Sequence, residues 1–211
     1  MEYYSFTKRP NNTELYKGNT KQHYLRLKND EIALKIFNEE NVEYDFIADN
    51  GDNHKLRYKK ASNGEYRIVG LKGFMEGNNL DAGCYITLEL VRFNDGTELR
   101  FIKSKQCENV FYLNKSKDGF EILNEGYENI VERDLIEKYT QDKIKIKEVG
   151  EKEKRADSPR KTKFYDIIRN DKSIAKDYKN NYSLELKVYL DENLISILPL
   201  NKSLESYAII K

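Results

Sequence analysis

Apolar and polar residues alternate over several short segments of the first hundred residues, and this pattern predicts a fold rich in β-strands. Residues 42–48, Val-Glu-Tyr-Asp-Phe-Ile-Ala, are the clearest case, since a period of two is typical of a strand with one buried face. Similar alternation predicts further strands at 3–7, 21–27, 54–60, 66–69, 84–93 and 99–102. Turns that contain glycine, at 49–52, 61–64 and 94–96, predict hairpins between several of them.

Two short helices are expected among these strands. The first covers residues 30–38, where Asn29 or Asp30 can cap the opening turn. The second is a helical turn at 71–75. The fold class predicted for the first half is therefore α+β and mainly β.

The second half of the chain mixes strand and helix patterns, which predicts a smaller α+β module over residues 106–211. Strands are expected at 109–113 and 120–123, and a hairpin from 184–190 and 194–198. The spacing of apolar residues predicts helices over 127–141 and 164–178. Residues 148–163 are highly charged and contain Pro159, so an exposed linker is expected there.

Charge is segregated along the 211 residues, although 37 Lys and Arg nearly balance 36 Asp and Glu for a net charge of +1. Residues 1–28 hold six bases and two acids, residues 29–53 one base and eight acids, and residues 54–72 six bases and one acid. A fold that brings the two basic segments to one face would create a dipole. A solvated surface of mixed sign is the alternative.

Composition excludes several classes of protein. No apolar run is long enough to span a bilayer, and the N-terminus lacks the apolar core of a signal peptide. Two Cys and two His are too few for a disulfide framework or a zinc site, and no phosphate-binding P-loop motif occurs. We expect a reduced, cytoplasmic protein without a cofactor.

Two polar stretches resemble the DNA-contacting arms of the B-three pseudobarrel family, which includes plant transcription factors and the N-terminal effector-binding domain of EcoRII-type restriction enzymes. Asn11-Asn12-Thr13 through Gly18-Asn19-Thr20-Lys21-Gln22 is similar to the N-arm, and Asn63-Gly64-Glu65-Tyr66-Arg67-Ile68 to the C-arm. The tract from Arg67 to Phe74, with Asn79-Leu80 and Ala82-Gly83, resembles the helix and turn before the family's long hairpin. The resemblance implies an open pseudobarrel over residues 1–105.

The resemblance also implies double-stranded DNA as the partner, held between the N-arm (residues 8–22) and the C-arm (residues 57–67). Basic side chains would contact phosphates, namely Lys8, Arg9, Lys17, Lys21, Arg57, Lys59 and Lys60. Forked side chains would read bases in the major groove, with Asn12, Gln22 and Asn63 on adenine, Arg67 on guanine and Glu65 on cytosine. The remaining candidate DNA contacts are the arm residues Asn11, Thr13, Asn19, Thr20, Ser62 and Tyr66. The alternatives are an ion pair between Glu65 and Arg67 and a merely solvated face for the lysines.

Catalysis is the competing class of function. Glu185-Leu186-Lys187 with Asp177 upstream matches the acid and E-x-K ligands of a Mg²⁺-dependent nuclease, but alternation on a polar strand produces this triplet by chance. We therefore expect no enzyme activity in this chain. It would serve as the site-specific reader of a restriction system, of the EcoRII type or the LlaJI type with an McrB-like subunit, whose nuclease or motor lies elsewhere. A protein-interaction module is the third alternative.

Overall fold

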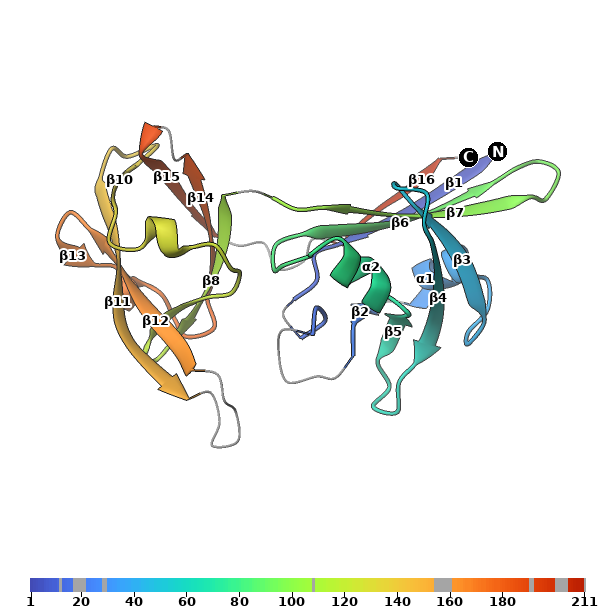
Figure 1. Cartoon of the computed structure of the whole chain (residues 1–211), viewed down its shortest axis with the longest axis horizontal. Helices are drawn as coiled ribbons and strands as arrows, with labels where there is room; N and C mark the ends of the chain where they lie inside the picture. The colour runs from blue at the N-terminus through green and yellow to red at the C-terminus, as the bar shows by residue number, and fades with distance from the viewer. Residues whose placement is uncertain are drawn as a thin grey trace. The chain divides into compact units, whose positions relative to one another are not determined.

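The computed structural model describes residues 1–11, 13–16, 22–27, 30–107, 109–153, 161–189, 192–199 and 205–210. It divides the chain into two compact units, Met1–Gln106 with Ser203–Lys211 and Cys107–Lys202. Each unit is built on its own eight-stranded sheet (Figure 1). The two units are called unit 1 and unit 2 below.

Unit 1 is a curled sheet with strand order β16-β1-β6-β7-β3-β4-β5-β2. Neighbours are antiparallel except for the parallel pair β3 and β7. The strands are β1 (Glu2–Lys8), β2 (Tyr24–Leu27), β3 (Glu43–Ala48), β4 (Asn53–Lys60), β5 (Tyr66–Val69), β6 (Tyr85–Arg92), β7 (Glu98–Lys105) and β16 (Glu205–Ile210). Two short helices, α1 (Asp30–Phe37) and α2 (Lys72–Gly77), accompany the sheet.

The core of unit 1 lies on the inner face of this sheet, because β3, β4, β6 and β7 alternate between buried and more exposed positions. Phe37 of α1 packs on Phe46 of β3 and Tyr58 of β4, with ring centroids 5.2 and 6.3 Å apart. Leu56 and Ile68 are fully or almost fully buried beside them. The outer face of β4 and β5 is thereby left to polar residues.

Unit 2 is a closed barrel. Its strands run in the order β11-β10-β15-β14-β8-β9-β12-β13, and β11 also pairs with β12, which closes the ring. They are β8 (Val110–Ser116), β9 (Gly119–Ile122), β10 (Asp134–Glu137), β11 (Lys143–Glu153), β12 (Lys161–Arg169), β13 (Lys172–Ser173), β14 (Ser183–Tyr189) and β15 (Leu194–Pro199). Two 3₁₀ turns, η1 (Glu128–Ile130) and η2 (Ala175–Asp177), accompany the barrel strands.

The mainly β fold with two short helices is confirmed, as is the hairpin of β14 and β15. The helices expected over 127–141 and 164–178 are wrong, because these segments supply η1, β10, β12, β13 and η2 to the barrel wall. The charged residues 148–153 and 161–163 are paired strand, not linker, and residues 154–160 of the expected linker lie outside the described residues. Residues 205–210 do not stay with the second module, because β16 pairs with β1. Among the described residues, no helix is both long and apolar enough to cross a membrane.

Candidate nucleic-acid interface

The two basic segments of the sequence meet on three adjacent strands, β2, β5 and β4. Arg26 of β2 lies opposite Arg67 of β5, and Arg67 lies opposite Lys59 of β4. Because residues opposite each other in a sheet point to the same side, these three cations form a row. Ile68, which follows Arg67 in β5, is buried in the core, so the row lies on the outer face of unit 1.

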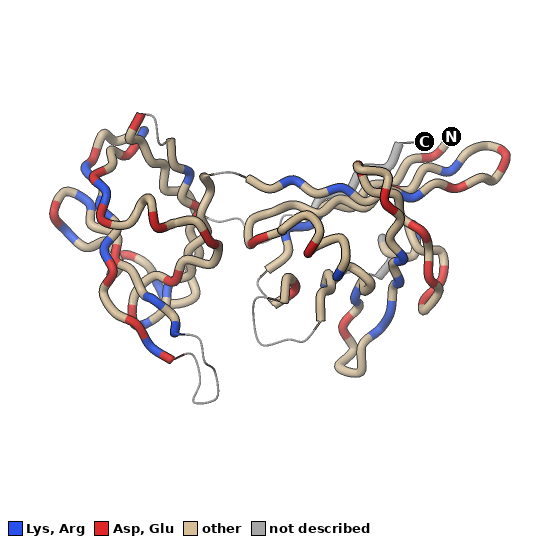
Figure 2. Tube along the Cα trace, in the orientation of Figure 1, with Lys and Arg blue, Asp and Glu red and all other residues tan. Residues whose placement is uncertain are grey.

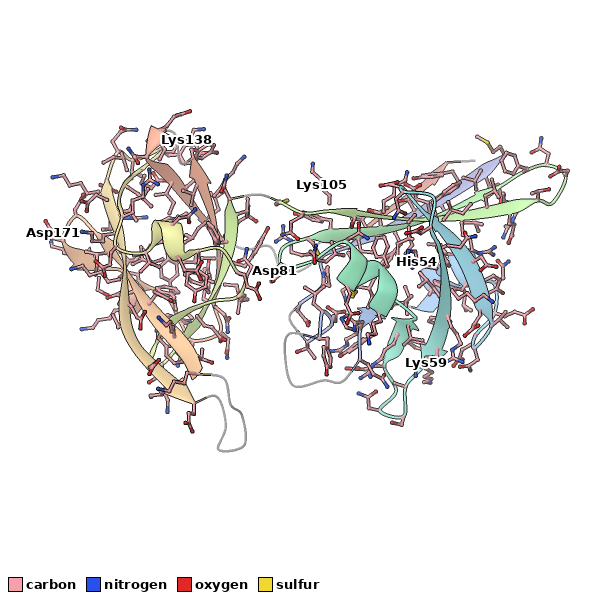
Figure 3. The ribbon with its side chains drawn as sticks, viewed as in Figure 1. His54, Lys59, Asp81, Lys105, Lys138 and Asp171 are labelled. Carbon is pink, nitrogen blue, oxygen red and sulfur yellow. The ribbon has the colours of Figure 1, made fainter. Side chains whose placement is uncertain are left out.

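This row sits near the end of the β4–β5 hairpin. Figure 2 shows basic positions gathered along β4, and Figure 3 shows Lys59 on β4 toward the hairpin end. The Arg26 side chain is 59% exposed. The loop beyond Lys60 carries Ser62 and Asn63, which are both exposed. Cations and hydrogen-bonding groups therefore meet at one end of the sheet.

Arg67 is held in a fixed orientation. Its Nε and Nη2 donate to Oε2 of Glu65 at 3.0 and 2.5 Å. Its guanidinium carbon lies 4.3 Å from the ring centroid of Tyr24, a stacking contact typical of arginine. Among the described residues, Nη1 of Arg67 has no hydrogen-bond partner. One nitrogen of an oriented guanidinium thus remains for a ligand.

Glu65 is shared between two arginines. In addition to the hydrogen bonds from Arg67, its Oε1 lies 3.3 Å from Nε of Arg26. Hydrogen bonds from Arg67 and then Asn63, with the positive charges of Arg26 and Arg67, lower the pKa of the Glu65 carboxyl despite its partial desolvation. The ion pair between Glu65 and Arg67, considered from the sequence as the alternative to base contact, is present in the structure.

The loop of the C-arm is a tight turn. The N–H of Ala61 donates to the carbonyl of Glu65 at 2.7 Å, and the N–H of Gly64 donates to the carbonyl of Ala61 at 2.9 Å. Asn63 Oδ1 accepts the N–H of Glu65 at 3.2 Å, as asparagine side chains do in turns. The positive φ of 82° at Gly64 is readily adopted by glycine. The turn exposes Asn63 while fixing its backbone.

The remaining C-arm candidates differ in exposure. Lys60 is exposed, with Nζ 5.3 Å from the ring centroid of Tyr66, and Tyr66 stacks on Tyr58 at 5.6 Å. Arg57 lies on the outer face opposite Glu43, and among the described residues its buried Nε has no hydrogen-bond partner. Lys60 is therefore accessible to a phosphate, whereas Tyr66 serves to stack within the hairpin.

The start of the N-arm has a structural role that the sequence did not predict. Lys8 Nζ contacts Oε1 of Glu14 at 2.6 Å, and the two side chains are only 12% and 2% exposed. Glu14 also accepts the N–H of Arg26 at 2.5 Å and that of Asn11 at 2.9 Å, while Asn11 Oδ1 accepts the N–H of Glu14 at 3.0 Å. The backbone carbonyl of Glu14 accepts the N–H of Tyr24 at 3.1 Å. Glu14 therefore accepts hydrogen bonds from two backbone N–H groups, those of Tyr24 and Arg26, along the outer edge of β2.

These contacts change the interpretation of several N-arm candidates. Lys8 and Asn11 bind Glu14, so they stabilise unit 1 and are less suited to contact DNA. Arg9 lies over the ring of Tyr85 at 4.8 Å and donates to its hydroxyl group. Thr13 and Gln22 are exposed. The candidates Asn12, Lys17, Asn19, Thr20 and Lys21 lie outside the described residues.

Arg26, Arg67, Glu65 and Tyr24 form a contact cluster, and two of its members, Arg26 and Tyr24, were not among the candidates from the sequence. Their alternation with Leu25 and Leu27 already indicated that they share the polar side of β2. What the alternation could not show is that β2 pairs with β5, which puts Tyr24 under the guanidinium of Arg67.

The residues of the E-x-K candidate lie on two elements of unit 2. Glu185 and Lys187 lie on β14 and Asp177 lies in η2. No group of three or more His, Cys, Asp or Glu residues suited to a metal ion occurs within the described ranges. Both cysteines, Cys84 and Cys107, are free thiols.

Comparisons with known proteins give little beyond a weak likeness in structure. No family model matches the chain, and no curated protein matches it. Among solved structures, the chain is similar to the protein titled "Arabidopsis FUS3-DNA complex", with 14% sequence identity and a TM-score of 0.35. The match covers 48% of this chain and 96% of that one.

Proposed function

We propose that this chain binds double-stranded DNA and reads its sequence with the outer face of β2, β5 and β4 and the loop of the C-arm. The observation that carries the proposal is the row of Arg26, Arg67 and Lys59 across three strands. Neighbouring strands lie about 4.8 Å apart, so this row extends about 10 Å. That width suits a charged, extended partner more than a small ligand.

The β4–β5 hairpin is the part that we propose enters the major groove. A two-stranded ribbon fits this groove, which is about 12 Å wide. The turn at 61–65 is closed by backbone hydrogen bonds and presents Asn63. Pairing of Asn63 with adenine would require its Oδ1 to leave the N–H of Glu65. Arg67 can pair with guanine through the part of its guanidinium group that Glu65 does not hold. Gln22, exposed just before β2, is the adenine-reading candidate from the N-arm.

Cations around these readers, of which Lys60 and Arg26 are exposed and Lys59 is half-buried, would contact the phosphate backbone. Lys59, Lys60 and Arg26 supply positive charge without a role in the core, and Arg57 follows them along the outer face of β4. Such contacts orient a protein on the duplex and make its affinity depend on salt. Lys8 is left out, because its ammonium group is committed to Glu14.

We further propose that the chain acts as the target-recognition part of a restriction system. The support is the likeness of its two arms to those of the EcoRII-type branch, set out above from the sequence. In this proposal, cutting and any nucleotide-driven movement belong to another domain or a partner subunit.

The experiment that tests DNA reading is selection of bound sequences from a randomised duplex at about 150 mM salt without metal, conditions under which purely electrostatic binding is weakened. We expect one short motif to be enriched. Arg67→Ala should then cost about 1–3 kcal/mol and relax one base-pair position. Lys60→Ala should weaken binding to all sequences alike and reduce the salt slope by about one.

Lys172→Ala is the matched control, because Lys172 is exposed on β13 of unit 2 and carries the same charge. It should leave affinity and motif unchanged. Absence of enrichment, or equal losses for all three variants on every sequence, contradicts sequence reading by this face.

A further inference from the structure

We infer that Glu65 is a positioning residue of this face: its carboxylate holds the guanidinium groups of Arg26 and Arg67 together and does not itself pair with a base. The inference rests on the DNA-binding function proposed above, because it concerns the same site. It replaces the assignment of Glu65 to cytosine that the sequence suggested.

The first step is that both oxygens of the carboxylate are already occupied. Oε2 accepts two hydrogen bonds from Arg67, at 3.0 and 2.5 Å, and Oε1 faces Nε of Arg26 at 3.3 Å. The side chain is only 19% exposed. The two hydrogen bonds from Arg67 fill Oε2, and Oε1 keeps one lone pair beside its contact with Arg26. A cytosine amino group would therefore compete with charged donors, whose hydrogen bonds are about twice as strong as neutral ones.

The second step is that the cluster needs an anion. Arg26 and Arg67 lie directly opposite each other across β2 and β5, and like charges in that position destabilise a pair of strands. Glu65, two residues before Arg67, places one negative charge between them. Hydrogen bonds from Arg67 and Asn63 lower its pKa, which keeps the carboxyl ionised at neutral pH.

The third step concerns specificity. Arg67 is restrained from two directions, by Glu65 along one edge and by the ring of Tyr24 under its plane. An arginine fixed in this way has fewer orientations in which to pair with a wrong base. Because Arg26 belongs to the strand after the N-arm and Arg67 to the C-arm, Glu65 also connects the two arms.

Glu65→Gln tests this, since it keeps the size of the side chain and removes its charge. We expect it to relax the same base-pair position that Arg67→Ala relaxes, and to lower discrimination there at least fivefold. Binding to non-target duplex should rise, because the face gains one net positive charge. In the double variant the loss at that position should not exceed that of Arg67→Ala alone, because coupled residues are not additive.

If Glu65 instead contacts a base directly, the result is different. Glu65→Gln would then relax a second base-pair position, and the two losses would multiply in the double variant. Either observation overturns the inference. Glu43→Gln is the matched control, because Glu43 is exposed on the same outer face opposite Arg57. It should raise binding to non-target duplex equally while leaving the motif intact.

A second measurement needs no DNA. The Arg67 Nε–H should exchange with solvent several times more slowly in the wild type than in Glu65→Gln, as followed by ¹H–¹⁵N NMR, whose backbone signals also check the fold. Should Glu65→Gln fail to fold, Glu65→Asp keeps the charge on a side chain one carbon shorter and should relax the same position. Equal exchange in wild type and variant overturns the inference. If the wild type selects no motif, the proposed function fails and the inference with it, whereas a retained motif with the wrong position relaxed overturns the inference alone.

Discussion

Replacing Glu14 with alanine is expected to destabilise unit 1 by about 3 kcal/mol, the low end of the range for breaking a buried ion pair. Its carboxylate is 2% exposed and accepts charged or backbone donors from Lys8, Asn11 and Arg26 at 2.5–2.9 Å. A hydrogen bond to a charged group contributes about 1.5–3 kcal/mol, and such contributions do not add. The low end applies because Lys8, at 12% exposure, can recover part of its hydration.

The assay is urea denaturation followed by the NMR amide signals of β2 and β5, which report unit 1 separately from unit 2. Glu148→Gln is the control, followed by the amide signals of β11 and β12 because it lies in unit 2; Glu148 and Lys163 lie 2.8 Å apart but are 38% and 48% exposed. Its loss should stay below about 1 kcal/mol, as for other exposed pairs. The double variant Lys8→Met with Glu14→Gln should recover most of the stability, because neither buried charge is then left alone. A loss below about 1 kcal/mol for Glu14→Ala, or one equal to that of Glu148→Gln, refutes the argument from burial.

Two further predictions concern the hairpin and its charge cluster. Gly70→Ala should destabilise unit 1 by more than about 3 kcal/mol in the same assay, because Gly70 has φ +94° and an added Cβ would lie 2.2 Å from the carbonyl oxygen of Lys55. Gly64 has φ +82° and an added Cβ would have no atom within 4 Å, so Gly64→Ala should cost only about 1–2 kcal/mol of backbone strain. Equal losses for the two variants would contradict this. The folded-state pKa of Glu65 is below its ordinary value of 4.5, so the ion pair with Arg67 stabilises the fold above that value and this contribution is lost as the pH falls through the folded pKa. Carboxyl ¹³C titration should place its midpoint below 4.5 in the wild type, and a midpoint at or above 4.5 would contradict the ion pair.

The strands of unit 1 could be predicted from the sequence because most of them have one buried and one polar face. Residues 43–48 and 53–60 alternate in burial in the structure as they do in polarity. The pairing of β16 with β1 could not be predicted, since it joins segments about two hundred residues apart. Local periodicity contains no information on such a contact.

The prediction for unit 2 was wrong where the local pattern of apolar residues fits more than one type of secondary structure. Residues 164–169 place apolar side chains at spacings that fit both a helix and a strand. They form β12 in the structure, where they pair with β11 and β9. The described charged residues of the expected linker, 148–153 and 161–163, are instead paired across strands, with Lys161 on Glu151 at 2.6 Å and Lys163 on Glu148 at 2.8 Å. Composition alone does not distinguish a solvated ribbon of paired charges from a tether.

The number of basic residues in a segment likewise does not show how many of them are available to a DNA phosphate. Residues 1–28 carry six bases, yet Lys8 is tied to Glu14 and Arg9 lies on Tyr85. Arg100 likewise is 8% exposed, and it donates to the carbonyl of Ile36 at 2.8 Å. A buried and paired cation cannot release counterions from a phosphate backbone, so it adds nothing to salt-dependent affinity. Arg26 is 59% exposed and Lys60 is exposed as well, so under the proposed function these two cations would contribute more to the salt-dependent affinity than Lys8 or Arg100.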